Sequence, residues 1–334
     1  MNEETRLRLF GFEDAFAHPV TLGATVGIGA CLIATLALIF GLNRMGKLSP
    51  ASYDELRKRT LSWCVIAPLL VVPILLGAFW VMLGTGLLAI TCYREYARAT
   101  GLFRYFAISA TVVVGIVVIM GAAIDHWYGL FLALPALGVV VIASVGILAD
   151  RPEGYIQRVA LGAFGFLLFA VCLGHFAYLG NDRDFRPVLL LVLLAVEAND
   201  IFAYLCGKSF GRRKLAPQTS PNKTIGGSLG AIVCTTVLVY FLGGAVFGDS
   251  LGGRAPLVGL GILVSVAGQL GDLMLSSIKR DLGIKDMAAT IPGHGGLLDR
   301  FDSLLLVAPA VFHYVGYFRG VGLDQQVMIF TGQG

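Results

Sequence analysis

The chain has 334 residues, of which 57% are hydrophobic and only 14% are charged, and its mean hydropathy is +0.80. Soluble globular domains carry about 25% charged residues, so this composition excludes an ordinary soluble protein and predicts an all-α, polytopic integral membrane protein. The formal net charge of +4 is modest and no soluble basic domain accompanies it, so we expect no nucleic-acid partner.

The predicted membrane-spanning helices follow one another along almost the whole chain. Residues 1–18 are amphipathic and lack the features of a signal peptide, and residues 20–42 form the first apolar run. The next run, 62–93, is too long for one helix, so we expect two helices joined by a tight turn near Trp80 or Gly84. Further runs that are long enough to span a bilayer lie at 105–124, 128–147, 159–180, 187–206, 228–247, 256–275 and 303–318. The sequence therefore predicts about ten transmembrane helices.

Basic residues are distributed unequally between the two sides of this predicted topology. Of the 25 Lys and Arg residues, 19 fall in loops that share one side, at 43–61, 94–104, 149–158, 207–227 and 276–302. The positive-inside rule places these loops in the cytoplasm and both termini outside. We expect the protein to lie in a bacterial inner membrane, among lipids whose anionic headgroups attract the basic side.

The first region with candidate chemistry begins at the end of the predicted span 187–206. Asp200 is a carboxylate inside an apolar helix, where charge is costly, so we favour a substrate-binding role over a buried packing role. Residues 220–224 read Ser-Pro-Asn-Lys-Thr and precede a pair of glycines. Hydroxyls, one lysine and backbone N–H groups at a helix start can cradle phosphate. We therefore expect three residues to bind a phosphate or nucleotide: Ser220, Lys223 and Thr224.

The second region, residues 277–302, contains four cations, four carboxylates and a histidine within 26 residues. Asp272 just ahead of it and Asp299 inside it return to the same membrane edge. There they can hold one or two Mg²⁺ ions and leave coordination positions open for phosphates. Four basic residues are expected to act in catalysis by neutralising charge on a phosphorus centre and on a leaving pyrophosphate: Lys279, Arg280, Lys285 and Arg300.

Two further residues of this region have open roles. His294 lies between glycines and either donates a hydrogen bond to a phosphate, which we favour, or is a structural loop residue. Asp302 either binds a ligand or orients Arg300. The alternative for the whole segment is an ordinary solvated loop, although such loops seldom combine this order, spacing and glycine content.

The order of these residues resembles the signature of the CTP:phosphatidate cytidylyltransferases, also called CDP-diacylglycerol synthases. The signature here reads Ser277-x-Lys279-Arg280-x4-Lys285-Asp286, followed by Pro292-x-His294-Gly295-Gly296-x2-Asp299-Arg300-x-Asp302. Upstream, residues 199–224 and Gly271-Asp272 resemble the second and third motifs of that family. The resemblance covers roughly 56–318. It makes residues 1–55 an N-terminal extension with one extra transmembrane helix and a linker, ahead of a cytidylyltransferase-like membrane domain at 56–334.

The resemblance implies a polytopic enzyme that joins CTP to phosphatidic acid with the help of Mg²⁺ and releases pyrophosphate and CDP-diacylglycerol. By analogy with the family, Asp272 and Asp299 are the metal-binding carboxylates, and Lys223 with its hydroxyl neighbours binds phosphate or nucleotide. The chain departs from the family at one position, because Gly226 stands where a glutamate usually follows the Ser-Pro-x-Lys-Thr-x motif. The missing carboxylate leaves the identity of the lipid acceptor open.

Other functions stay open at the level of the sequence. The enzyme alternatives are cytidylyl transfer to another lipid phosphate and CTP-dependent phosphorylation of a polyisoprenol. A transporter for an anionic solute would suit the intramembrane Asp200 and the abundant glycine, although the key motifs show no inverted repeat. A catalytically inactive membrane scaffold is the third class. A second copy of the chain is a further candidate partner, because the sequence does not decide whether the protein forms a homodimer.

Overall fold

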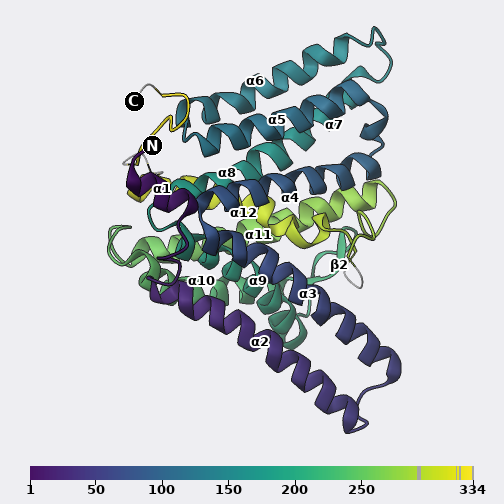
Figure 1. Ribbon diagram of the computed structural model, residues 1–334. Helices are drawn as coiled ribbons and strands as arrows, with labels where there is room; N and C mark the ends of the chain where they lie inside the picture. The colour runs from purple at the N-terminus through teal and green to yellow at the C-terminus, as the bar shows by residue number, and fades with distance from the viewer. Residues whose placement is uncertain (292–294, 321, 323–324, 333–334) are drawn as a thin grey trace.

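The structure, a computed structural model, describes residues 1–291, 295–320, 322 and 325–332. Long helices run side by side between two ends of the molecule (Figure 1). Within the described residues, nine helical segments are long and apolar enough to cross a membrane. A tenth, α4 (Ala78–Ala99), runs between the same two ends and carries charged residues only in its last turns. The expectation of an all-α, polytopic integral membrane protein is therefore confirmed.

The elements follow the predicted order. They are α1 (Glu3–Phe10), α2 (Pro19–Arg44), α3 (Pro50–Leu76), α4, the 3-10 turn η1 (Leu102–Arg104), α5 (Phe106–Ile124), α6 (Tyr128–Ile147), α7 (Tyr155–Gly165), the π-helical segment η2 (Phe166–Cys172), α8 (Leu173–Tyr178), η3 (Leu179–Asn181), α9 (Phe185–Phe210), β1 (Lys214–Ala216), β2 (Ser220–Thr224), α10 (Ile225–Phe247), α11 (Ala255–Asp281) and α12 (Leu298–Arg319). Segments α7 to η3 together form one of the spans.

The predicted division of the apolar run 62–93 into two helices is confirmed, with the break at Gly77, three residues before Trp80 rather than at Gly84. Gly77 has φ 132° and ψ 167°, a conformation that residues with a side chain rarely adopt. A Cβ atom at this position would lie 2.4 Å from the carbonyl oxygen of Leu9, because the end of α1 packs directly against the break. Trp80 and Gly84 lie inside α4. Hydropathy cannot locate such a break, since the contact that fixes it comes from a distant segment.

Several loops are shorter than predicted, because the helices continue past the apolar runs. Residues 50–61, predicted to be a loop, form the first three turns of α3, which is capped by a hydrogen bond from the Ser52 backbone N–H to the Ser49 hydroxyl. The predicted boundary between residues 55 and 56 therefore lies inside a helix. Residues 94–99 and 276–281 likewise complete α4 and α11. Charged side chains at helix ends reach water, so the change in composition marks the membrane edge rather than the end of the helix.

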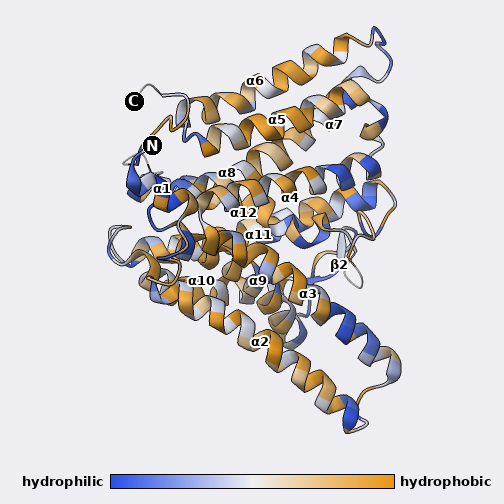
Figure 2. Cartoon of the chain, in the orientation of Figure 1, coloured by the Kyte–Doolittle hydropathy of each residue, from blue (hydrophilic) through white to orange (hydrophobic). Residues whose placement is uncertain are grey.

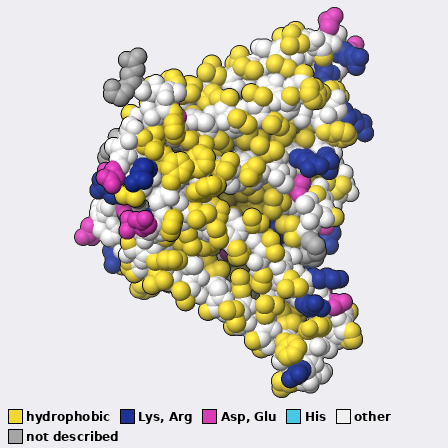
Figure 3. Space-filling model, in the orientation of Figure 1, with side chains coloured by type: hydrophobic (Ala, Val, Ile, Leu, Met, Phe, Trp, Pro, Cys, Tyr) yellow, Lys and Arg dark blue, Asp and Glu magenta, His cyan; other side chains and the backbone are white. Residues whose placement is uncertain are grey.

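The two ends of the bundle differ in charge. The described residues of the five basic segments of the predicted topology lie at one end, whereas α1 and the described C-terminal residues 325–332 lie at the other (Figure 1). Hydrophobic residues occupy the middle of the helices and hydrophilic residues their ends (Figure 2). Lys and Arg side chains line the basic end, while the opposite end carries clusters of both signs (Figure 3). The structure thus brings the basic segments together, and which end faces the cytoplasm stays a prediction.

Aromatic packing between α6, α8 and α12 forms part of the core. The ring centroids of Phe131 and Tyr178 lie 4.6 Å apart, and those of Tyr178 and Phe312 lie 5.5 Å apart, with all three side chains at most 1% exposed. Next to this core, α9 packs against α10 and α11, and α11 against α12. The α2–α3 hairpin, by contrast, extends away from the body at the basic end (Figure 1). The described residues that the sequence singled out lie on three of these helices, α9, α11 and α12, on the β1–β2 hairpin that precedes α10, and in the loop before α12.

Candidate active site

Two lysine–aspartate pairs lie at the basic end of α11. Lys223, in β2, places its Nζ atom 2.5 Å from Oδ2 of Asp272, and Lys279 places its Nζ atom 2.7 Å from Oδ1 of Asp299. The second pair is almost enclosed, with side chains 13% and 2% exposed. Four residues that are distant in sequence and were each predicted to act on phosphate or metal are therefore brought together in two contacts.

Asp299 also binds two backbone N–H groups of the segment between α11 and α12. Its Oδ2 atom accepts hydrogen bonds from the backbone N–H groups of Met287, at 2.9 Å, and Gly296, at 3.0 Å. With Lys279, three donors therefore converge on one carboxylate. A carboxylate in the first turn of a helix also interacts favourably with the helix dipole. Asp299 thus fixes the path of the loop as well as the position of Lys279.

Glu95, on α4, is a site residue that the sequence did not reveal. Its Oε1 atom accepts hydrogen bonds from the Leu297 backbone N–H, at 3.0 Å, and the Thr290 hydroxyl, at 2.6 Å, and its Oε2 atom accepts one from the Leu298 backbone N–H, at 2.8 Å. Only 6% of Glu95 is exposed. The side chain therefore caps the N-terminus of α12 from another helix, satisfying backbone groups that a helix start leaves open.

The one sequence feature that pointed to Glu95 is that this acid lies near the C-terminal end of its helix. An acid near the C-terminal end of a helix opposes the helix dipole, so a compensating partner could have been expected. That partner lies about two hundred residues further along the chain, which no local pattern discloses. Gly296 completes the arrangement, because a Cβ atom there would lie 2.6 Å from Oε2 of Glu95.

Acidic residues from three helices act electrostatically on one another beside the lysines. The charge of Asp200, on α9, interacts with those of Asp272 and Lys223, and the charge of Asp302, on α12, interacts with those of Asp272 and Asp200. A second acid, Glu197, precedes Asp200 by three residues on the same face of α9 and was not predicted. The predicted residues on α9, α11 and α12 thus form one charged cluster.

A buried polar network supports this cluster from within the bundle. Oδ1 of Asn199 accepts hydrogen bonds from the hydroxyls of Ser265, at 2.5 Å, and Thr235, at 3.2 Å. Nε2 of Gln269 donates to the Ser265 hydroxyl, at 3.1 Å, and to the Ser228 carbonyl, at 3.3 Å. These contacts join α9, α10 and α11, where small polar side chains hold membrane helices close together. The network therefore holds α9, α10 and α11 in fixed positions next to the charged cluster.

The predicted phosphate cradle is a β-hairpin rather than a simple loop. Ser220, Lys223 and Thr224 lie on β2, which pairs antiparallel with β1, and Thr224 caps α10 by accepting a hydrogen bond from the Gly227 backbone N–H at 3.1 Å. A Cβ atom at Gly226 would lie 2.8 Å from the carbonyl oxygen of Phe210. The end of α9 therefore presses against Gly226, and the glutamate that the family usually has here would require the backbone to move.

The remaining predicted residues are spread around the cluster. Arg280 is exposed, and its Nε donates to the Thr219 carbonyl at 3.3 Å, which ties α11 to the hairpin. Lys285 is exposed on the loop before α12. Arg300 is half-buried, and its buried Nε has no hydrogen-bond partner among the described residues. His294 lies outside the described residues.

The carboxylates of the charged cluster are the type of oxygen ligand that Mg²⁺ prefers, but those that the structure describes lie too far apart for three of them to share one ion as they stand. In the part of the chain that the structure describes, no group of three or more His, Cys, Asp and Glu residues is placed to share one metal ion. The carboxyl groups of Asp200 and Asp302 nevertheless both lie near that of Asp272, and a divalent cation with oxygen ligands would favour bringing such groups closer together. Asp299 already accepts three hydrogen bonds, which leaves one lone-pair position, on Oδ1, for a metal ion.

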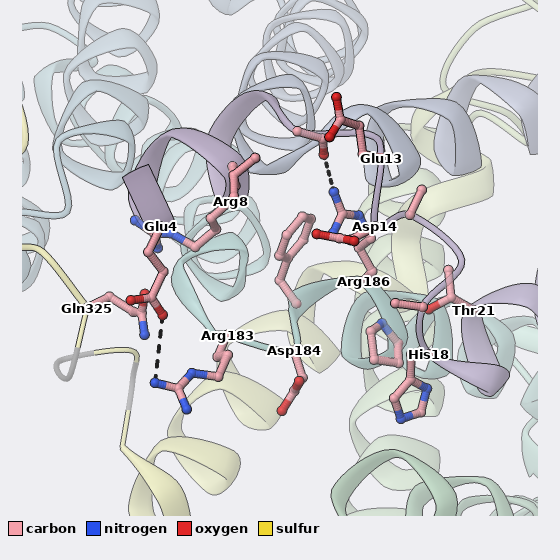
Figure 4. Close-up of a pocket in the computed structure, with 16 residues that line it drawn as sticks. Glu4, Arg8, Glu13, Asp14, His18, Thr21, Arg183, Asp184, Arg186 and Gln325 are labelled. Atoms are coloured by element: carbon pink, nitrogen blue, oxygen red, sulfur yellow. Dashed lines mark hydrogen bonds and ion pairs between the residues drawn. The ribbon is translucent and has the colours of Figure 1, made fainter. Parts of the chain in front are cut away.

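A polar pocket of about 300 Å³ lies at the opposite end, between the N-terminal segment and the start of α9 (Figure 4). Arg183 lies 3.7 Å from Glu4 across it, and Arg186 donates a hydrogen bond to the Gly11 carbonyl. Of the predicted site residues that the structure describes, none lines this pocket. Its charged groups join the N-terminal segment to the bundle.

The fold and the site together define a class: a polytopic membrane protein whose lysines and carboxylates meet at one membrane edge. A family model described as the cytidylyltransferase family matches residues 57–318. The chain belongs to this family, as its sequence motifs indicated, and it is a membrane-embedded nucleotidyltransferase. The matched residues include the two lysine–aspartate pairs and Glu95.

Relatives with named functions support the same family. The chain is 33% identical over 264 residues to a phosphatidate cytidylyltransferase of Staphylococcus aureus (strain COL), an alignment that covers 76% of this chain and 96% of the relative. A phosphatidate cytidylyltransferase of Staphylococcus haemolyticus is 32% identical with the same coverage. The chain is also 37% identical over 193 residues to the uncharacterized protein YnbB of Escherichia coli K12. That alignment covers 56% of this chain and 63% of the relative, so the chain spans less than two thirds of that protein's length.

Proposed function

We propose that this protein transfers a cytidylyl group from CTP to phosphatidic acid, giving CDP-diacylglycerol and pyrophosphate in a Mg²⁺-dependent reaction. The observation that carries the proposal is the pairing of Lys223 with Asp272 and of Lys279 with Asp299 at the end of an apolar bundle. Each lysine is held in place by a carboxylate until a phosphate competes for it. The names of the staphylococcal relatives support phosphatidate as the acceptor.

The reaction needs charge neutralisation and positioning more than proton transfer. An oxygen of the lipid phosphate attacks the α-phosphorus of CTP, and the bond from that phosphorus to the oxygen bridging the α- and β-phosphates breaks, so that pyrophosphate leaves. The lipid phosphate is already anionic near neutral pH, so no strong base is required. Lys223 and Lys279 stabilise the charge that develops on the phosphoryl oxygens and on the leaving pyrophosphate. The closely packed ends of α9 to α12 hold the reactants in line.

Each remaining predicted residue has a place in this scheme. Ser220 and Thr224 lie beside Lys223 on the hairpin and contribute to nucleotide binding, while Asp200 and Asp302 orient the neighbouring cations. Mg²⁺, held by Asp272 and Asp299, would supply further neutralisation at the triphosphate. Arg280, Lys285 and Arg300 contact phosphate from the loop side or the mouth of the site, and His294, which lies outside the described residues, stays a predicted hydrogen-bond donor to phosphate.

We infer that the basic end of the bundle faces the cytoplasm of a bacterial inner membrane, with both termini outside. The concentration of 19 of the 25 Lys and Arg residues in segments on this side supports that orientation. CTP is a cytoplasmic metabolite, so the same orientation gives the site access to its soluble substrate. The lipid acceptor reaches the site from within the membrane.

A second acceptor is favoured by one specific observation. Residue 226 is a glycine where the family usually has a glutamate. A Cβ atom there would lie 2.8 Å from the Phe210 carbonyl oxygen, so the structure leaves little room for a side chain. A different lipid phosphate is therefore the alternative acceptor.

The test uses the purified protein in mixed micelles with radiolabelled CTP, phosphatidic acid and Mg²⁺. We expect labelled liponucleotide and pyrophosphate in equal amounts from the wild type. The Asp299→Asn variant should lose at least about 100-fold in turnover, because the amide cannot hold both Lys279 and the two loop N–H groups. Asp281→Asn, an exposed change at the end of α11, is the matched control and should leave turnover unchanged. If the wild type binds CTP but yields product only with another lipid phosphate, that lipid and not phosphatidate is the acceptor.

A further inference from the structure

An apolar groove of about 470 Å³ runs along the bundle between α3 and α4. The helices α9 and α12 and the side chain of Phe176 form its floor, and almost all of its lining is hydrophobic. On α4 the lining extends from Trp80 to Thr91, a distance of about 16 Å along the helix. Hydrophobic side chains cover this side of the molecule (Figure 3), so the groove opens where lipid would surround the protein.

One end of the groove meets the charged cluster. The lining residues Leu297, at the N-cap of α12, and Phe301 and Leu304, within it, recur at helical spacing, and Arg300 precedes Leu304 by four residues on the same side of the helix. On α9, the lining residue Leu193 is followed one turn later by Glu197, whose charge interacts with that of Arg300. The groove is therefore continuous with the site along two helices.

We propose that this groove holds one acyl chain of the lipid acceptor, with the lipid phosphate at Arg300 and the chain running past Leu304 and Leu193 toward Trp80. The proposal rests on the proposed function, because it assumes that the acceptor is a lipid phosphate. Arg300 suits the phosphate, since its buried Nε has no hydrogen-bond partner among the described residues. A guanidinium can bind phosphate through charge-assisted hydrogen bonds.

The groove acts through shape rather than through hydrophobic attraction. Lipid tails in the bilayer are as apolar as the leucines that line the groove, so moving a chain from the membrane into it gains little free energy. What the groove provides is orientation, because a chain fixed along α4 holds its phosphate next to the site. A side chain that fills the groove should therefore exclude long acyl chains and leave short ones unaffected.

Gly84 is the position at which this can be tested. A Cβ atom there would meet only the side chain of Pro73, at 3.7 Å, so a larger side chain would extend into the groove without striking backbone. Gly84→Phe is the test variant. Gly121→Phe is the matched control, because a Cβ atom at Gly121, on α5, would meet no heavy atom within 4 Å and this glycine does not line the groove.

The experiment compares phosphatidates with eight-carbon and eighteen-carbon chains in the purified enzyme. Gly84→Phe should lower kcat/KM for the long-chain lipid about tenfold relative to the short-chain lipid, with the KM for CTP unchanged. Gly121→Phe should change neither. An equal loss with both lipids, or no loss with either, would overturn the groove assignment while the wild type still makes product. A wild type that makes no liponucleotide from either lipid would overturn the proposed function, and this inference with it.

A second measurement covers the case in which Gly84→Phe does not fold. A phosphatidate with a photoreactive diazirine at the end of one acyl chain is added to the wild type, and the labelled peptides are mapped after irradiation. We expect label on α3 or α4, near Leu70, Trp80 or Leu83. Label confined to α5, α6 or α10 would contradict the proposal.

Discussion

Helix α12 carries an ion pair at each of its ends, and the two ends differ in what surrounds them. At its start Asp299 pairs with Lys279, at 2.7 Å, and at its finish Arg319 lies 2.7 Å from Asp182 and 3.0 Å from Asp184. Both arrangements suit the helix dipole, with the acid first and the base last. An ion pair alone therefore does not distinguish a functional end from a structural one.

The difference lies in the neighbouring charges. Around Arg319, two acids share one guanidinium, and the contacts join α12 to the segment between η3 and α9. Around Asp299 lie a second lysine–aspartate pair, further acids on α9 and α12, and Arg300, whose Nε has no hydrogen-bond partner among the described residues. The proposal that the basic end is the active site rests on this larger number of charged groups, which lie beside an apolar groove.

The largest effect within this comparison should come from Lys223→Ala. The change removes the cation of the hairpin and leaves Asp272 without its ion-pair partner, so we expect kcat/KM for CTP to fall about 100-fold. Steady-state kinetics with varied CTP measure this. Lys214→Ala, an exposed change on β1 of the same hairpin, is the control and should lie close to the wild type. Equal losses in the two variants would show that the hairpin contributes only general positive charge.

A smaller effect should follow from Glu95→Gln. Glutamine keeps the size of the side chain but loses the charge that holds the N–H groups of Leu297 and Leu298, so the start of α12 should loosen. We expect kcat to fall about tenfold, with the KM for CTP changing less, because Glu95 positions the loop rather than binding substrate. The control is Glu55→Gln, which removes only an exposed pair with Arg59 on α3. Unchanged kcat in Glu95→Gln would mean that the loop needs no anchor from α4.

These two residues show how far sequence reasoning reached. The spans, the basic side and the acids and lysines of the site follow from hydropathy, charge and motif order, all of which are local in the sequence. Glu95, the break at Gly77 and the pairing of each lysine with one aspartate depend on contacts between segments that are far apart in the chain. Residues 50–61 were misassigned to a loop for a different reason, since composition marks the membrane edge and not the end of α3.

The smallest effect should come from Gly226→Ala, which tests the departure from the family. The new Cβ would lie 2.8 Å from the Phe210 carbonyl oxygen, so α9 and α10 would have to separate slightly at a cost of about 1–3 kcal/mol. Thermal unfolding in detergent should show a Tm lower by several degrees. Gly29→Ala on α2, where a Cβ meets nothing within 4 Å, should leave the Tm unchanged. An unchanged Tm in Gly226→Ala would show that this contact can relax freely and that the Phe210 carbonyl does not exclude a Cβ atom at this position.

The most direct test of the contrast between the two ends of α12 is to measure turnover and Tm side by side in Lys279→Ala and Arg319→Ala. The first change removes a cation from the site, and the second removes one from the opposite end. We predict that Lys279→Ala loses most of its cytidylyl transfer per folded molecule and that its Tm also falls, because the enclosed Asp299 loses its cationic partner. Arg319→Ala should lose Tm and keep its turnover per folded molecule. Full turnover in Lys279→Ala, or a selective loss of turnover in Arg319→Ala, would contradict the placement of the active site at the basic end.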